Sequence, residues 1–505
     1  MNKLLKAMFC VTFFSVSTRA LGFLLKIYLS RKLSSELLGS YQVAMSIFAV
    51  FMTLVSSGIP VVLSRNTSFY HGKNNQRGIG SLVSSGLILT GIISLIVCLV
   101  VIFCPSLMEI LFTSKESADM ILILLPALVF SSIYEVLRGA LWGKQHFFDI
   151  SFTEFLEQIT RIIILVILFE TAIFDMSLTN KTALSLSIAC IISSIHVAII
   201  YFKKGGTFAN PKYEFKNLLK TSSPITAVRT ISSIVSSIIA VIIPIRLMTF
   251  GYTSSEALSI FGIIMGMTFP LIMIPSTLIS SLAVTIIPSI SEQSNDIDNG
   301  ELKNTSILKS KINFSLKTTV LFSTILLPLY LSAGIPICKF IFNNEQAGKY
   351  LIFAAVLMIP MGISQITSSI LNAIGLEMKS LKNYAVASTL LIICIYFLPK
   401  YIGGFAIIVG YLCMSICSST MNIIMLKNRK LISFEFLKTA IKMISISVFA
   451  AAIGYFTYNI LSNIELIALF ISSAITMISM ISLVYVFNIA NIKMIFFKPK
   501  TSSTK

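Results

Sequence analysis

The chain contains fourteen separate apolar stretches, each long enough to cross a bilayer as a helix. About 20 consecutive apolar residues span the hydrocarbon core. Within lipid, an α-helix satisfies its backbone polar groups inside a single segment. We therefore predict an all-α integral membrane protein with 14 transmembrane helices. They are expected near residues 8–31, 38–66, 79–104, 118–142, 153–174, 182–202, 222–248, 257–290, 313–341, 349–374, 381–399, 402–426, 437–461 and 465–490.

The composition supports a membrane location and argues against nucleic acid as a partner. Hydrophobic residues make up 56% of the 505 residues and charged residues 12%, and the mean hydropathy is +0.91. These values lie outside the usual range of soluble globular proteins. A formal net charge of +19 would suggest nucleic-acid binding in a soluble protein. Here the lysines and arginines occupy short loops between apolar spans, where they set the orientation of the helices.

The basic loops predict which side of the cell membrane each end of the chain occupies. Lysines and arginines cluster in segments 65–77, 203–220 and 427–430, each of which follows an even-numbered predicted helix. The loops after odd-numbered helices are poor in positive charge or acidic. Because cytoplasmic loops carry the excess of Lys and Arg, we expect both termini in the cytoplasm.

The residues that carry catalysis or bind metals are scarce. The chain has eight cysteines, three histidines and one tryptophan. The cysteines lie almost entirely inside apolar segments, without the spacing of a metal site or a disulfide framework. We therefore expect no enzyme activity, no catalytic residues, no metal and no cofactor.

The chain is predicted to contain two similar halves. Ser34-Ser35-Glu36 recurs as Ser254-Ser255-Glu256. Further pairs follow in the same order: Pro105 with Pro336, Pro126 with Pro360, and Gly143 with Gly375. Six helices separate the equivalent positions, which indicates parallel repeats, and such repeats usually enclose a central substrate cavity. We predict an N-lobe of six helices at 1–204, a cytoplasmic amphipathic linker at 205–221, a C-lobe of six helices at 222–430, and two more helices with a basic tail at 431–505.

A second polar segment, 292–311, is mixed in charge and is expected to be a cytoplasmic loop. Composition of this kind usually marks a solvated loop. A solvated loop could also bind a partner protein, and this alternative remains open.

Ionisable residues inside the predicted helices are the candidate substrate-binding residues, because a charge near the bilayer centre is costly and normally faces a cavity or a partner. Arg19 and Lys26 lie seven residues apart on nearly the same face of the first helix. Arg229 occupies a similar place in the seventh helix, and Glu157 and Arg161 lie on the fifth.

Structural explanations remain open for several of these charges. A salt bridge between Arg19 and Glu157 would neutralise both residues, and Lys26 could reach the membrane surface. Glu157 and Arg161, at spacing i, i+4, could pair with each other. The same holds at i, i+3 for Glu135 and Arg138 on the fourth helix.

Several short motifs in this order resemble the stage V sporulation protein B family, a polysaccharide-export branch of the multidrug/oligosaccharidyl-lipid/polysaccharide exporter superfamily. The motifs are Thr18-Arg19-Ala20-Leu21-Gly22-Phe23, Gly39-Ser40-Tyr41-Gln42, Gly58-Ile59-Pro60, Leu137-Arg138-Gly139, Gly143-Lys144-Gln145, Glu157-Gln158-Ile159-Thr160-Arg161 and Asn372-Ala373-Ile374-Gly375. The resemblance implies two six-helix lobes like those of multidrug and toxin extrusion (MATE) transporters, related by pseudo-two-fold symmetry, plus two C-terminal helices.

The resemblance also implies a function. Members of this family are expected to be flippases that move an undecaprenyl-pyrophosphate-linked saccharide from the inner to the outer leaflet by alternating access, in spore-cortex or cell-wall synthesis. Arg19 and Arg161 match the family's motif arginines, and Glu157 matches its motif acid. MurJ-type lipid II flippases carry further arginines where this chain has Leu25 and the apolar run 48–54. That departure argues against lipid II itself as the substrate.

Two other functions remain as alternatives. The first is a multidrug cation antiporter of the same fold, although a cationic drug would be bound by carboxylates rather than by the excess of embedded positive charge. The second is a membrane scaffold without transport activity, which would recruit wall-synthesis proteins through its cytoplasmic loops. The scaffold predicts that neutralising Arg19 is harmless and that deleting 292–311 is not.

Overall fold

A computed structural model describes residues 3–104, 112, 114–171, 175–298, 304–461 and 464–487. The described residues form helices joined by short turns, and no strand occurs among them. Contacts between Cα atoms divide the chain into two compact units, Met1–Gly266 and Met267–Lys505. We call them unit 1 and unit 2.

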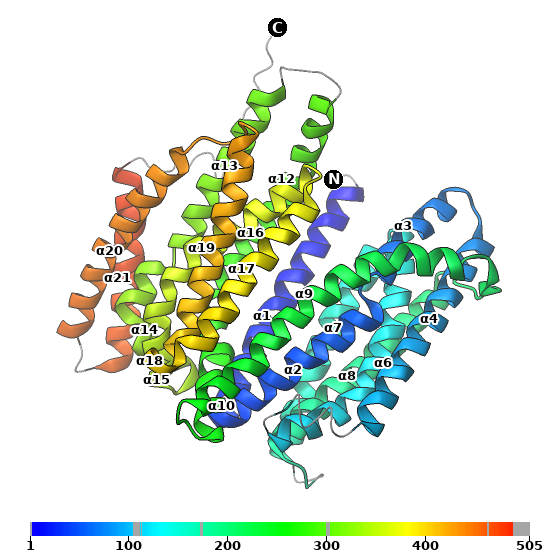
Figure 1. Cartoon of the computed structure of the whole chain (residues 1–505), viewed down its shortest axis with the longest axis horizontal. Coiled ribbons are helices and arrows are strands. Elements are labelled where there is room, and N and C mark those ends of the chain that lie inside the picture. The colour runs from blue at the N-terminus through cyan, green and yellow to red at the C-terminus, as the bar shows by residue number, and fades with distance from the viewer. Residues whose placement is uncertain are drawn as a thin grey trace. The chain divides into compact units, whose positions relative to one another are not determined.

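Unit 1 is a bundle of long helices, shown from blue to green in Figure 1. Its helices are α1 (Lys3–Lys32), α2 (Ser35–Ser56), α3 (Ile59–Gly72), α4 (Gln76–Phe103), α6 (Lys115–Gly143), α7 (Phe147–Glu170), α8 (Leu178–Lys203), α9 (Phe215–Thr249) and α10 (Ser254–Gly262). A short 3-10 helix at Pro211–Tyr213 precedes α9. A π-helix at Ile263–Thr268 follows α10 and contains the boundary between the units.

Unit 2 contains the remaining helices, shown from green to red in Figure 1. They are α11 (Phe269–Ile272), α12 (Ile274–Asp298), α13 (Asn304–Thr324), α14 (Leu327–Phe342), α15 (Glu345–Ala354), α16 (Met358–Ala373), α17 (Glu377–Phe397), α18 (Pro399–Ile402), α19 (Phe405–Asn428), α20 (Glu435–Ile460) and α21 (Glu465–Val486). A single 3-10 turn at Ala355–Leu357 joins α15 to α16.

Each of the fourteen predicted stretches contains a helix, which confirms the all-α membrane fold. Among the described residues, 12 helical spans are long and apolar enough to cross a membrane, so this is a multi-pass membrane protein. The count of 14 transmembrane helices and the orientation of the termini stay predictions. Several predicted helices are broken by prolines, because a proline lacks the N–H that continues the helix and clashes with the preceding turn. The stretch 38–66, for example, divides before Pro60 into α2 and α3.

The polar segment 292–311 differs from the predicted loop. Helix α12 continues to Asp298 and α13 begins at Asn304, so most of the segment is helical. Polar residues extend a helix into water at little cost when the apolar part of the same helix is already packed. Residues 299–303, the predicted basic tail from residue 488 onward, and Pro105 lie outside the described residues.

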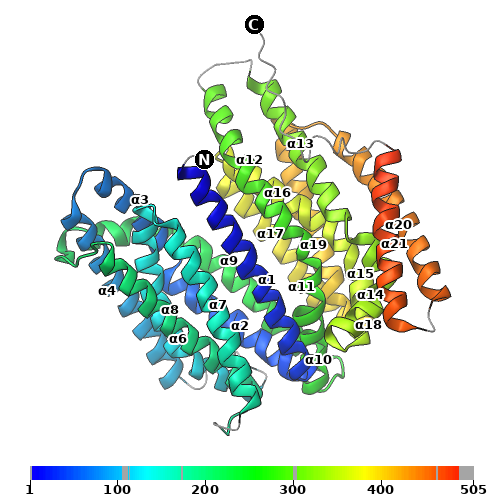
Figure 2. The same cartoon turned by 180° about the vertical axis from the view of Figure 1, so that it is seen from behind.

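In unit 1, α6 packs on α8, α3 and α4, α1 lies along α7, and α2 packs on α9 and α10. Figure 2 shows α1 beside α7. The contact between α2 and α10 depends on glycine, since a Cβ added at Gly39 would overlap the backbone of Leu258. The repeated Ser-Ser-Glu motif begins both helices: Ser34 caps α2, and Thr253 with Glu256 forms a capping box on α10.

The packing of unit 2 centres on a buried apolar cluster contributed by α12, α13, α16 and α20. Helices α20 and α21 pack on α14 as well as on each other. A Cβ at Gly454 of α20 would overlap Thr476 of α21, so these two helices approach closely. The division at 266/267 differs from the predicted lobes because α9 and α10 pack on α2. The predicted lobes, which rest on the sequence repeat, and the predicted linker at 205–221 remain a proposal.

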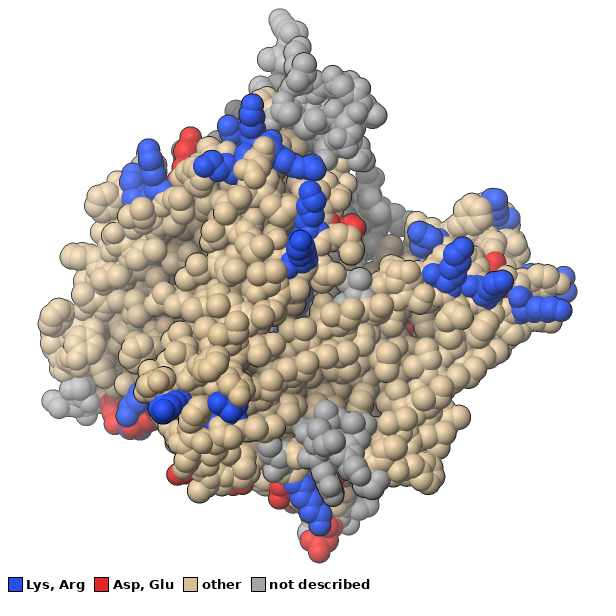
Figure 3. All heavy atoms as spheres, in the orientation of Figure 1, with Lys and Arg blue, Asp and Glu red and all other residues tan. Residues whose placement is uncertain are grey.

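Charged residues are sparse over much of one face of the molecule. On the face shown in Figure 3, lysines and arginines gather near the ends of helices, and the surface between these groups is mostly uncharged. Large apolar side chains are exposed along the helices, for example Ile441 at 66% and Phe449 at 60% in α20. Exposed apolar area on this scale is expected where lipid replaces water as the solvent.

Candidate functional site

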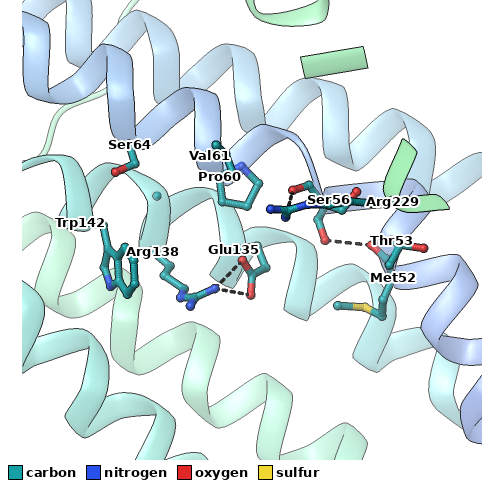
Figure 4. A pocket seen from close by; sticks show the side chains of 12 residues that line it. Met52, Thr53, Ser56, Pro60, Val61, Ser64, Glu135, Arg138, Trp142 and Arg229 are labelled. Carbon is teal, nitrogen blue, oxygen red and sulfur yellow. Dashed lines mark hydrogen bonds and ion pairs between the residues drawn. The ribbon is translucent and has the colours of Figure 1, made fainter. Parts of the chain in front are cut away.

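Unit 1 contains a cavity of about 550 Å³ beside the break between α2 and α3 (Figure 4). Helices α6 and α9 complete its walls. It combines three charged side chains with four hydroxyl groups and one tryptophan. The lining residues are Met52, Thr53, Ser56, Ser57, Pro60, Val61, Ser64, Glu135, Arg138, Gly139, Trp142 and Arg229.

The sequence at 57–60 explains why the helix breaks at this place. Pro60 lies in the first turn of α3, where its missing N–H costs no hydrogen bond. Gly58 precedes it and packs against α9, so that a Cβ there would overlap the Ser222 backbone and the Thr226 hydroxyl. The break therefore needs a proline for the helix start and a glycine for the close approach of α9.

Arg138 is the centre of an ion-pair network at the cavity wall. Its Nη1 lies 3.0 Å from Oε2 of Glu135, and its Nε lies 3.1 Å from Oε1 of Glu154 on α7. The contact with Glu154 is close but is not aligned as a hydrogen bond. The guanidinium carbon also lies 5.1 Å from the centre of the Trp142 ring, a cation–π distance. Two carboxylates thus neutralise Arg138, as the i, i+3 spacing of Glu135 predicted in part.

Arg229 projects from α9 into the same cavity and has a different environment. Its Nη1 donates a hydrogen bond to the carbonyl oxygen of Ser57 at 2.8 Å, and its side chain is exposed. Among the residues that the structure describes, no carboxylate oxygen lies within 4.0 Å of this guanidinium. Arg229 therefore keeps a full positive charge available in the cavity.

A second group of charges lies where α1, α2 and α7 meet. Nη2 of Arg161 donates to the hydroxyl of Tyr41 at 3.0 Å. Lys26 on α1 is near enough to Arg161 for the two positive charges to repel each other. Glu157 lies one turn before Arg161 on α7 and attracts it electrostatically. Within the described part of the chain, neither Lys26 nor Arg161 has a carboxylate within 4.0 Å.

Arg19 lies nearer than Lys26 to the N-terminal end of α1, and its side chain is exposed. The salt bridge to Glu157 that would have neutralised it does not form among the described residues. Near Arg19, α1 contacts α7 through small and apolar groups. Gly22 faces Gln158, and Phe14 packs against Phe148, Phe152 and Phe155.

The predicted site residues thus fall into three places. Lys26, Glu157 and Arg161 lie together, Arg229 lines the cavity, and Arg19 stands apart on the face of α1 that also carries Lys26. Sequence reasoning treated Glu135 and Arg138 as a structural pair and did not place them, or Trp142, in a cavity. The sequence spacing could have indicated that these three side chains lie together, because residues 135, 138 and 142 share one face of α6.

The described residues contain no group of three or more His, Cys, Asp or Glu side chains arranged to hold a metal ion. The charged and hydroxyl side chains of unit 1 offer charge pairing and hydrogen bonding. An anion with several oxygens could be held by guanidinium and ammonium groups, and hydroxyl groups could be held by Thr53, Ser56 and Ser64.

Comparison with known families decides the assignment. The model of the family described as polysaccharide biosynthesis protein matches residues 4–294, more than half of the chain. The chain belongs to the polysaccharide biosynthesis protein family. The matched range includes residues 4–266 of unit 1, with the cavity and both groups of charges.

Curated relatives of this polysaccharide biosynthesis family member come from Bacillus subtilis (strain 168). The chain is 27% identical over 289 residues to stage V sporulation protein B, covering 54% of this chain and 55% of that protein. It is 22% identical over 305 residues to sporulation protein YkvU, covering 58% and 66%. The chain thus aligns with about half to two thirds of the length of these relatives. The match to stage V sporulation protein B confirms the resemblance found in the sequence motifs.

Solved structures confirm the fold of this family member. An inward closed lipid II flippase MurJ superposes with a TM-score of 0.72 at 18% identity, covering 94% of this chain and 98% of that chain. An inward-facing MATE family multidrug resistance transporter of the MOP superfamily superposes with a TM-score of 0.67 at 15% identity, covering 82% and 94%. At these identities the likeness establishes the architecture alone.

Proposed function

We propose that the protein is a flippase that moves an undecaprenyl-pyrophosphate-linked saccharide from the inner to the outer leaflet by alternating access. Its expected place is cell-wall or spore-cortex synthesis. The names of similar proteins support this class: one is a lipid II flippase and another a stage V sporulation protein. The description of the family also names polysaccharide biosynthesis.

One observation carries the proposal. Four of the candidate cations have no carboxylate oxygen within 4.0 Å among the described residues: Arg19, Lys26, Arg161 and Arg229. An unneutralised cation inside a membrane protein costs at least a few kcal/mol. That cost is recovered when an anion binds, and a pyrophosphate is the part of the cargo that most needs replacement of its lost water.

In this proposal, binding of the cargo is divided between two places. The cavity offers Arg229 to the pyrophosphate, with hydroxyl groups for the first sugar. A second cationic position, outside the lining of the cavity, is formed by Lys26 on α1 and Arg161 on α7. The membrane potential assists export, because moving two negative charges outward releases roughly 4 to 5 kcal/mol per 100 mV, before any charge movement of the protein is subtracted.

Transport in liposomes tests the proposal. The purified protein is reconstituted, and the transbilayer movement of a fluorescent undecaprenyl-pyrophosphate oligosaccharide is followed with and without an imposed potential. The parent should transport, and Arg19→Ala and Arg229→Gln should lose most of the activity. Lys339→Gln is the matched control, since it removes a cation that is already paired with Glu345 and Glu465 at 3.2 Å. Absence of transport by the folded parent under any gradient contradicts the proposal.

Trp142 allows headgroup binding to be measured separately. It is the single tryptophan of the chain and it lines the cavity. Its fluorescence in detergent should respond to inorganic pyrophosphate at lower concentration than to sulfate, and Arg229→Gln should abolish the difference.

A multidrug cation antiporter is the second candidate. Glu157 favours it, because no cationic nitrogen of the described residues lies within 4.0 Å of this carboxylate. Uptake of a fluorescent organic cation into the same liposomes, lost in Glu157→Gln and retained in Arg229→Gln, would favour the antiporter over the flippase.

A further inference from the structure

The peptide unit between Ser57 and Gly58, at the break between α2 and α3, is held by two side chains of α9. Arg229 donates to the Ser57 carbonyl at 2.8 Å. The Gly58 N–H donates to Oγ1 of Thr226 at 3.2 Å. Thr226 and Arg229 are three residues apart and therefore share a face of α9. Both polar groups of a single peptide unit are thus satisfied from one neighbouring helix, an arrangement that we call the junction clasp.

The clasp has a physical reason. A broken helix leaves backbone groups without partners, and inside a membrane protein each such group costs free energy unless another group replaces the missing bond. In a continuous helix, the Ser57 carbonyl would accept from the N–H of Val61, and the Gly58 N–H would donate to Leu54. Arg229 and Thr226 take the places of these two partners.

The structure shows the clasped bonding pattern, and the bonds of a continuous helix are the alternative to it. Pro60 disfavours the continuous helix, because its ring would clash with the carbonyl four residues earlier, at Ser56. The clasp favours the broken form by bonding the exposed peptide unit. The balance between the two forms depends on whether Arg229 stays on the Ser57 carbonyl.

Arg229 also faces the cavity and lacks a carboxylate partner among the described residues. A guanidinium binds a phosphate oxygen more strongly than a neutral carbonyl, because the hydrogen bond is then assisted by charge on both sides. An anion in the cavity thus competes with the Ser57 carbonyl for the same donor.

We infer that Arg229 couples the occupancy of the cavity to the shape of the α2–α3 junction: an anionic headgroup draws Arg229 from the Ser57 carbonyl and releases the clasp. The inference rests on the proposed function for the nature of the anion. Thr226 is then a positioning residue, which stabilises the clasped form without contacting the cargo. A ligand that competes with the clasp prefers the released form. By linkage, a change that weakens the clasp and leaves Arg229 in place strengthens ligand binding.

Thr226→Val tests this coupling, because valine has a similar shape but cannot accept the Gly58 N–H. The full-length protein in detergent is titrated with inorganic pyrophosphate while Trp142 fluorescence is recorded. The expected result is binding tighter than in the parent by about 2- to 10-fold, the range that corresponds to one lost hydrogen bond. Hydrogen–deuterium exchange of the segment 53–62 should be faster in the variant without ligand, and pyrophosphate should accelerate it in the parent.

Two controls isolate the hydroxyl of Thr226. Thr226→Ser keeps the acceptor and should match the parent in both measurements. Thr230→Val removes a hydroxyl one turn farther along α9 that has no hydrogen-bond partner among the described residues, and it should also match the parent.

The outcomes separate the coupling from the function. If pyrophosphate binds the parent but Thr226→Val changes neither the affinity nor the exchange of 53–62, the coupling is wrong and the flippase proposal stands. If the folded parent binds no pyrophosphate while Thr226→Val still accelerates exchange, the clasp is purely structural. That result overturns the ligand-driven switch together with the pyrophosphate site.

Discussion

Arg161 on α7 donates to the Tyr41 hydroxyl on α2 at 3.0 Å although Glu157 lies one turn away on its own helix. Glu157 and Arg161 do not form the ion pair that their i, i+4 spacing allows. Arg161 bonds instead to a neutral hydroxyl group of another helix. Tyr41 is 8% exposed, so it directs the guanidinium from a fixed position. Arg161 consequently retains a charge that Glu157 would otherwise neutralise.

The first prediction concerns this choice of partner. In Tyr41→Phe, the guanidinium should turn towards Glu157, and transport should fall by roughly 2- to 10-fold, the effect of about one hydrogen bond. The double variant Tyr41→Phe with Glu157→Gln should recover most of the loss, because the competing carboxylate charge is gone. Liposome transport measures both effects. Equal activity in the single and double variants would contradict a role for Glu157 as the competing partner.

The second prediction concerns Lys26, whose charge is repelled by Arg161. Lys26→Met should stabilise the protein by less than about 1 kcal/mol, because the side chain is exposed and solvent screens the repulsion, and it should reduce transport. Thermal unfolding in detergent checks the first effect and liposome transport the second. The control is Lys317→Met, whose ammonium lies 2.6 Å from Glu435 and whose removal should not stabilise. A destabilised Lys26→Met protein would count against the repulsion.

The third prediction concerns Arg138, which lies between two carboxylates. Arg138→Gln leaves Glu135 and Glu154 facing each other without a cation, and their side chains are only 23% and 32% exposed. We expect a loss of about 2 to 4 kcal/mol in the free energy of unfolding, close to the range for broken buried pairs. Glu154→Gln, which keeps the pair with Glu135, should lose less. Denaturant unfolding of both variants measures the difference, and equal losses would show that Glu154 contributes as much as the whole network.

The fourth prediction concerns pH at the turn between α6 and α7. Burial and the nearby Lys204 ammonium lower the pKa of His146 below its ordinary value of 6.5, despite the attraction of Asp149. Near pH 6.5 and just below it, His146 therefore binds more protons in the unfolded chain than in the folded one. The contribution of His146 is therefore fully present above about pH 6.5 and is lost as the pH falls.

His146→Asn should remove this dependence. Thermal unfolding at pH 7.5 and pH 5.5 provides the measurement, and the parent should lose more stability on acidification than the variant. A variant that loses as much as the parent would place the acid sensitivity elsewhere.

Much of the fold could be predicted from the sequence because hydropathy acts locally. A helix in lipid satisfies its own backbone, so long apolar runs such as 118–142 and 437–461 locate α6 and α20 without knowledge of their neighbours. Pro60 likewise indicates a break within its own apolar run, because proline acts on the turn that contains it. The polar segment 292–311 was the exception, since helices can extend into water once their apolar parts are packed.

The candidate site could be predicted as a set of residues but not as an arrangement. The cost of a charge in lipid singles out Arg19, Lys26, Glu157, Arg161 and Arg229 from the sequence by itself. Which of them are neutralised depends on which helix faces meet. Tyr41 is 120 residues from Arg161, and Ser57 is 172 residues from Arg229. A helical repeat specifies the face on which a side chain lies, whereas its partner across the bundle is decided by tertiary packing, and only there did Arg229 become the donor that holds the α2–α3 junction.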